Sequence, residues 1–143
     1  MGQYYLVVNV SKGQYMKPHN FGDGAKLMEF AMAGEGIMAA LAVLLVSGNG
    51  RGGGDLRCSS NLIGSWAGDR IVIAGDYDDY GLFVVEFAAA VGVEISDENL
   101  NITNLYSFAV NHGRDVSDEI RQALSDADEP LACDKRRSFK VHW

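Results

Sequence analysis

A run of ten apolar residues, 37–46, limits most strongly what this 143-residue chain can become. The run is about half the length that a helix needs to cross a bilayer. Because no side of it is polar, it predicts a helix that is buried all round, inside the domain or at a subunit contact. A buried strand is the alternative, since periodicity does not separate the two in a segment this short. Such a segment is hard to cover in one small domain, so we also expect a homodimer.

The rest of the chain predicts a single compact α+β domain over residues 1–143. Residues 4–10 and 15–16 flank Ser11-Lys12-Gly13 and predict an N-terminal hairpin. Residues 71–75 predict a buried strand in the middle of a sheet, and residues 138–143 predict a closing strand. Strands bracket helices without a regular βαβ alternation. We therefore expect a mixed or antiparallel sheet packed with three to four helices.

The helices are predicted from apolar spacing and from capping residues. One is expected over 25–33 with Asp23 as its cap, and one over 37–46. Residues 82–93 are ambiguous between strand and helix. Two further helices are expected, one from Ile102, Leu105, Tyr106, Ala109 and Val110, and one from Val116, Ile120, Ala123 and Leu124 with Ser117 as its N-cap.

The charge balance excludes several classes of partner. The net charge is −7 and the isoelectric point is about 4.8, which opposes binding to a nucleic acid polymer or to an anionic membrane. The basic residues 135–137 are interpreted as a solvated strand edge. Two distant cysteines and an N-terminus unlike a signal peptide favour the cytoplasm.

A glycine-rich loop follows the apolar run. Residues 48–53 match the spacing GxGxxG, but the segments around them do not predict the strand and helix that a dinucleotide site needs. Five glycines in residues 48–54 would still let backbone amides converge on an anion, and Arg51 and Arg57 would pair with phosphate or carboxylate. A plain connecting loop is the alternative.

An acidic turn, residues 76–81, follows the predicted strand. It begins like an EF-hand loop, but Phe87 stands where that loop requires a glutamate. Asp76, Asp78 and Asp79 would instead hold Mg²⁺ or Mn²⁺, or they form a solvated turn. The three histidines lie in separate regions and give no zinc-hydrolase spacing.

Trp66 stands between Gly64 and Gly68 and is interpreted either as a core anchor or as an exposed stacking surface. With the loop and the acidic turn, it defines one hypothetical concave binding surface at which a small ligand is held. That surface would be made by Arg51, Asp55, Trp66, Asp69, Arg70 and Asp76. The expected ligand contacts also include Gly52, Gly53, Arg57 and Tyr77.

Four segments also carry a family resemblance. They are residues 1–5, His19 with 21–24, residues 53–56, and residues 66–70 running on to Asp76-Tyr77. Over roughly the first 80 residues the chain resembles a group of short uncharacterised proteins of bacteria and their phages. The resemblance implies a bacterial or phage cytosol, and it transfers no activity or site residue.

Three functions follow from these patterns, and whether the chain catalyses anything is left open. The first is a non-catalytic binding protein for a small anionic ligand, such as a nucleotide or nucleotide-derived signal. The second is a protein-interaction module, for instance an inhibitor of a host enzyme, suggested by the apolar run and the acidic surface. The third is a Mg²⁺- or Mn²⁺-dependent hydrolase that uses the aspartate cluster; otherwise no cofactor is expected.

Overall fold

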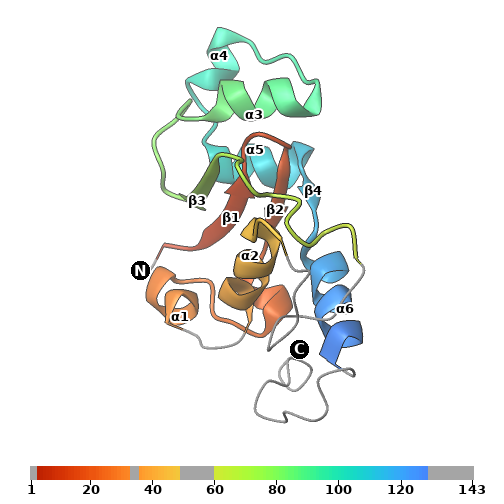
Figure 1. Cartoon of the computed structure of the whole chain (residues 1–143). Coiled ribbons are helices and arrows are strands. Elements are labelled where there is room, and N and C mark those ends of the chain that lie inside the picture. The colour runs from red at the N-terminus through yellow and green to blue at the C-terminus, as the bar shows by residue number, and fades with distance from the viewer. Residues whose placement is uncertain (1–2, 33–35, 49–59, 129–143) are drawn as a thin grey trace.

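The computed structural model describes residues 3–32, 36–48 and 60–128 (Figure 1). Its strands are β1 (Tyr5–Asn9), β2 (Gln14–Met16), β3 (Ile71–Gly75) and β4 (Arg114–Asp115), and they form one sheet in the order β3-β1-β2-β4. Strand β1 is antiparallel to β2 and β3, whereas β2 and β4 are parallel. The sheet is therefore mixed, and the α+β fold predicted from the sequence is confirmed.

The predicted N-terminal hairpin is present, with Val7 opposite Met16. Its turn is closed by the Gly13 amide, which donates to the Asn9 carbonyl at 3.0 Å. The side-chain oxygen of Asn9 accepts from the Lys12 amide at 2.9 Å. Gly13 has a φ of +69°, and a Cβ atom there would lie 2.3 Å from Cγ1 of Val91. Glycine is thus required by both the backbone angle and the close approach.

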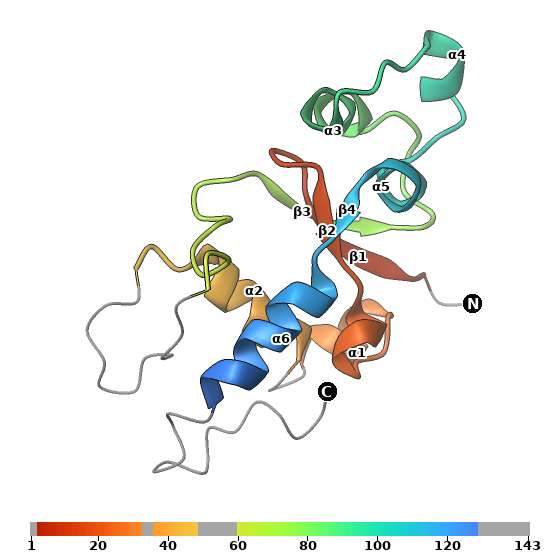
Figure 2. The same ribbon diagram turned by 90° about the vertical axis from the view of Figure 1, so that its right-hand side faces the viewer.

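Helices cover both faces of the sheet (Figures 1 and 2). On one face lie α1 (Leu27–Ala31), α2 (Ile37–Leu45) and α6 (Ser117–Asp128), and on the other lie α3 (Val84–Val91) and α5 (Leu105–His112). A short α4 (Asp97–Leu100) and a 3-10 helix over Pro18–Phe21 complete the described elements. More helices are present than the three to four expected, because the ambiguous segment 82–93 contains α3 and because the short α4 was not predicted.

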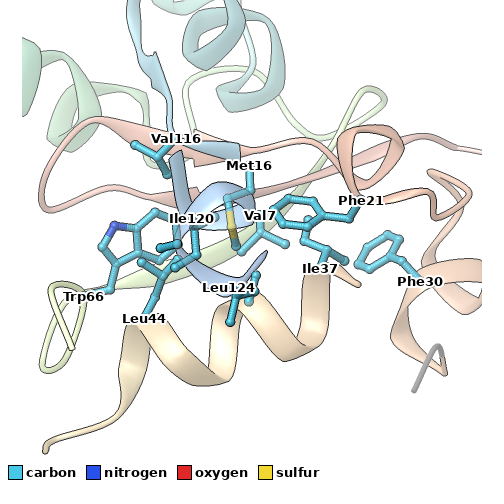
Figure 3. Close-up of a cluster of buried hydrophobic side chains, with 12 residues drawn as sticks. Val7, Met16, Phe21, Phe30, Ile37, Leu44, Trp66, Val116, Ile120 and Leu124 are labelled. Atoms are coloured by element: carbon cyan, nitrogen blue, oxygen red, sulfur yellow. The ribbon is translucent and has the colours of Figure 1, made fainter. Parts of the chain in front are cut away.

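Two hydrophobic clusters fill the two interfaces between sheet and helices. The first contains Val7 and Met16 from the sheet and residues from α2 and α6 (Figure 3). The second contains Leu6 and Val8 from the sheet and residues from α3 and α5. Successive side chains of β1 therefore enter opposite cores, as the alternation of a strand requires, and the four residues Leu6 to Asn9 are all buried.

The apolar run forms a helix, as predicted, but it is not buried all round. Ile37, Ala40 and Leu44 of α2 are fully buried in the first cluster, whereas Leu45 is 38% exposed. The domain alone therefore does not bury every side of the helix, and burial of the open face at a subunit contact stays a prediction. One face of the helix packs on the sheet and α6, and the opposite face is partly open.

Both predicted N-caps bind elsewhere. The Asp23 carboxylate accepts from the Ile37 amide at 2.9 Å, so it holds the start of α2 rather than of α1. Burial raises the pKa of Asp23, against the lowering effect of this bond. The Ser117 hydroxyl accepts from the Lys17 amide at 2.9 Å, and the Asp115 carboxylate accepts from the Ser117 amide instead. In both cases a tertiary partner outcompetes the local one.

Strand β3 lies at the edge of the sheet, not in its middle. Within the described residues it pairs with β1 alone, and Ile73 is 36% exposed. The prediction of a central, nearly inaccessible strand is therefore wrong, and β1 occupies that position. The helix expected near Ile102 begins at Leu105, which leaves Ile102 68% exposed.

The closing strand expected over 138–143 and the basic residues 135–137 lie outside the described residues. Of the helices in the described part of the chain, none has the length and apolarity needed to span a membrane.

Candidate functional site

A surface hollow of about 350 Å³ lies at the carboxyl end of β3. The turn that follows the strand forms most of it, and α5 contributes the rest through the residue just before its first turn. Tyr77 and Tyr80 are exposed, at 65% and 63%. The lining residues, which we call the acidic hollow, are Asp76, Tyr77, Asp78, Asp79, Tyr80 and Asn104.

Two of the three aspartates hold the turn against the sheet. The Asp76 carboxylate accepts from the Tyr4 amide at 3.0 Å. One oxygen of Asp78 accepts from the Gly75 amide at 2.8 Å, and the other accepts from the Gln3 side chain at 3.2 Å. These bonds fix the backbone of the hollow to β3 and to the residues just before β1. Asp79, by contrast, is exposed to solvent.

Asn104 joins the turn to helix α5. Its side-chain nitrogen donates to the Asp76 carbonyl at 2.9 Å and more weakly to the Asp78 carbonyl at 3.4 Å. Its side-chain oxygen accepts from the Ser107 amide at 3.0 Å and so caps α5. Only 5% of Asn104 is exposed. The hollow therefore has a rigid floor in which every polar group of this amide is used.

The electrostatics of the hollow favour cations. Among the described residues, its lining carries three carboxylates, two phenol rings, one amide and no basic side chain. Below it, burial raises the pKa of Tyr106, and the negative charge of Asp76 raises it further. The Tyr106 phenol is therefore neutral at physiological pH. A positively charged group entering the hollow would meet carboxylates and exposed aromatic rings, both of which attract cations.

The metal hypothesis finds no support in this arrangement. Among the described residues, no three His, Cys, Asp or Glu side chains are grouped so that they would hold a metal ion. Asp76 and Asp78 instead direct oxygens at backbone and amide donors. A site for Mg²⁺ needs several oxygens converging at about 2.0–2.1 Å. These two aspartates therefore act as turn-forming residues, which is the alternative expected beside the metal site.

Trp66 is a core residue and not a stacking surface. It is 0% exposed and lies in the first hydrophobic cluster (Figure 3). Its indole nitrogen donates to the side-chain oxygen of Gln14 at 2.7 Å. Of the two interpretations of this tryptophan, core anchoring is the one the structure bears out, and Trp66 leaves the set of candidate ligand contacts.

Asp69 and Arg70 lie at the beginning of β3 and have partners within the fold. Asp69 accepts from Asn9 at 2.8 Å and pairs with Lys12. The Arg70 guanidinium donates to Glu86 at 2.7 Å and lies 6.0 Å from the centre of the Phe83 ring. Arg70 and Asp76 are six residues apart along an extended segment, hence about 20 Å.

The single concave surface expected from the sequence is therefore not formed by its described members. Trp66 is inside the core, and Arg70 and Asp76 lie at opposite ends of a strand. Tyr77 and the three aspartates do share one site, the acidic hollow. Five other predicted contacts, Arg51, Gly52, Gly53, Asp55 and Arg57, lie outside the described residues. The small-anion hypothesis depends on them and stays a prediction.

Asp69 makes stability depend on pH. Burial raises its pKa, but the bonds from Asn9 and Lys12 and the Lys12 charge outweigh this, so the pKa lies below its ordinary value. A lowered carboxylate pKa contributes stability above the unfolded value, and this contribution is lost as the pH falls through the folded value. We expect Asp69→Asn to cost about 1–2 kcal/mol at neutral pH. Urea unfolding measured from pH 6 down to pH 2 should show that the difference in free energy of unfolding between the wild type and Asp69→Asn becomes smaller. A difference that stays constant would contradict the lowered pKa of Asp69.

The sequence did not single out Asn104, Gln3 or Tyr80 as site residues. Asn104 directly precedes the helical pattern that starts at Leu105, and asparagine is a preferred N-cap. Residue type and position would therefore have indicated its capping role. Its bond to the Asp76 carbonyl spans 28 residues and has no sequence pattern.

Comparison with known proteins adds no relative: no family model, no curated protein and no solved structure matches this chain.

Proposed function

We propose that the chain is a non-catalytic protein-interaction module whose acidic hollow takes a basic side chain, lysine or arginine, from a partner protein. The observation that carries this is the composition of the hollow. A space of about 350 Å³ is lined by three carboxylates and two phenols, and both rings are largely exposed. A guanidinium or ammonium group satisfies carboxylates and stacks on tyrosine rings at once.

A rigid floor supports binding over catalysis. Backbone amides hold the carboxylates of Asp76 and Asp78, and the Asn104 side chain holds the Asp76 carbonyl. Sites whose geometry is fixed before the ligand arrives lose less entropy when it binds. The proposal needs no proton transfer.

The first test uses a short peptide as a probe for the unidentified partner. We choose a capped peptide with two arginines and the same peptide with citrulline, which keeps the shape of arginine and removes its charge. Calorimetry at low salt should give weak binding of the arginine peptide and none of the citrulline peptide. Equal heats for the two peptides would contradict the proposal.

A pair of charge-matched variants locates the binding. Asp79→Asn removes an exposed carboxylate of the hollow, whereas Asp118→Asn removes an exposed carboxylate on α6. Each lowers the negative charge by one. Since exposed ion pairs contribute about 0.2–1 kcal/mol, Asp79→Asn should weaken the arginine peptide about twofold to fivefold. Asp118→Asn should leave the affinity for the arginine peptide unchanged. Equal weakening by both variants would show that the peptide responds to the net charge of the protein and not to the hollow.

A further inference from the structure

The outer edge of β3 has no strand beside it in the part of the chain that the structure describes. Its pairing with β1 is bounded by two backbone hydrogen bonds. The Asp76 amide donates to the Tyr4 carbonyl at 2.9 Å, and the Val10 amide donates to the Arg70 carbonyl at 3.0 Å. Hydrogen-bonded and non-hydrogen-bonded pairs alternate along an antiparallel ladder. These two bonds therefore set which residues of β3 face β1.

By this alternation, Val72 and Ala74 direct their backbone groups to β1. The amides and carbonyls of Ile71 and Ile73 point away from the sheet. Gly75 also points outward, but its amide is bound by the Asp78 carboxylate at 2.8 Å and its carbonyl accepts from the Asp78 amide at 3.1 Å. The open edge thus consists of two donors and two acceptors, on Ile71 and Ile73.

This edge lacks the usual protection against pairing. Natural edge strands carry lysine, proline, bulges or inward-pointing charges that prevent another strand from joining them. Ile71, Val72 and Ile73 are all β-branched and uncharged, and the Ile73 side chain is 36% exposed. In a chain of net charge −7, an uncharged and unprotected edge is suited to a strand partner.

We propose that this partner is β3 of a second copy of the chain, antiparallel, with the two-fold axis passing at Val72. In that register Ile71 of each copy lies opposite Ile73 of the other. The two symmetric pairs make four backbone hydrogen bonds, and they use only the groups that the fold directs outward. Centring the axis on Ile73 instead would place Ile71 opposite Gly75, whose backbone groups are already bound.

The charges at the two ends of the strand are self-complementary in this arrangement. Arg70 stands at the beginning of β3 and Asp76 at its end, and both are on the face shared with Val72. The two-fold axis brings Arg70 of each copy, whose guanidinium also donates to Glu86 of its own chain, to the position diagonal to Asp76 of the other. Diagonal neighbours lie about 7–8 Å apart between Cα atoms, which a long side chain spans. A parallel pairing would set like charges side by side.

One strand pair is a small contact, so we expect weak association, with dissociation constants in the micromolar range or above. Sedimentation equilibrium of the full chain over a wide concentration range should show a monomer–dimer equilibrium. Ile73→Lys places a charge on the edge and should weaken dimerisation about tenfold or more. Val85→Lys, at a residue 57% exposed on α3, is the control and should dimerise normally. A monomer at all concentrations, or equal dimerisation of both variants, would overturn the proposal.

A cysteine at the axis tests the register itself. Val72 would face Val72 of the second copy as a non-hydrogen-bonded pair, with Cα atoms about 4.5 Å apart, a separation that a disulfide spans. In a chain with Cys58→Ser and Cys133→Ser, Val72→Cys should form a disulfide-linked dimer on mild oxidation, with an unchanged circular dichroism spectrum. Val85→Cys should not. If the protein forms dimers that do not crosslink through residue 72, the proposal that β3 forms the interface would be overturned.

Discussion

Replacement of Trp66 by alanine is expected to lower the free energy of unfolding by about 3–5 kcal/mol, the range for large aromatic truncations in a core. Trp66 is fully buried among side chains of β1, α2 and α6. The substitution leaves a cavity, and it also leaves the Gln14 side-chain oxygen without the indole donor that lies at 2.7 Å. A domain with typical stability of about 5–15 kcal/mol would approach its unfolding limit.

Urea unfolding followed by circular dichroism measures this loss. Tyr77→Ala is the control, because its ring is 65% exposed and surface substitutions usually change stability by less than about 0.5 kcal/mol. If Trp66 were instead a ligand-stacking residue, its replacement would leave stability near the wild-type value. A loss below about 1 kcal/mol would therefore contradict the core assignment.

The second large effect is expected at Asn104. Asn104→Ala removes the cap of α5 and the donor to the Asp76 carbonyl together. A lost cap costs about 0.5–2 kcal/mol, and an unsatisfied buried acceptor about 1–3 kcal/mol. We expect a total loss of about 2–3 kcal/mol, accompanied by weaker binding in the acidic hollow because its floor is no longer held.

Ser96→Ala is the matched control for this variant. Ser96 caps α4 through the Asn99 amide at 3.2 Å, and this cap is exposed and makes no bond to the turn. The control should lose about 0.5–1 kcal/mol, with binding unchanged. Equal losses for the two variants would show that Asn104 acts only as a helix cap and does not organise the hollow.

Patterns local in sequence predicted local structure well. The hairpin and the strand Ile71–Gly75 follow from residue type and spacing within a few positions, and the apolar run forms the helix that was expected ahead of a buried strand. The position of β3 at the sheet edge did not follow, because centre and edge depend on which distant strand pairs with which. β1 and β3 are similarly apolar segments, and only the pairing order distinguishes them.

The N-caps show the same limit at the level of single residues. Asp23 and Ser117 are suitable capping residues by type and position. In the folded chain Asp23 binds the Ile37 amide, 14 residues away, and Ser117 binds the Lys17 amide, 100 residues away. A hydroxyl or carboxylate accepts from whichever amide the tertiary fold brings closest, and no local pattern records that choice.

The acidic turn was located correctly as a polar surface feature, whereas the sequence does not show which groups its side chains bind. Sequence spacing cannot show that two of the three aspartates face backbone donors, or that Asn104 completes the hollow. Trp66 was similarly ambiguous, because a tryptophan between glycines fits both a buried anchor and an exposed platform. Only its burial distinguishes the two.

The binding of a basic side chain in the acidic hollow is tested most directly by nuclear magnetic resonance. The isotopically labelled full chain is titrated with the arginine peptide and, separately, with its citrulline counterpart. We expect the arginine peptide to shift the backbone amides of residues 76–80 and the side-chain NH₂ of Asn104, while resonances of α6 stay in place. Shifts spread over the whole surface, absent from residues 76–80, or identical for the citrulline peptide would contradict the account.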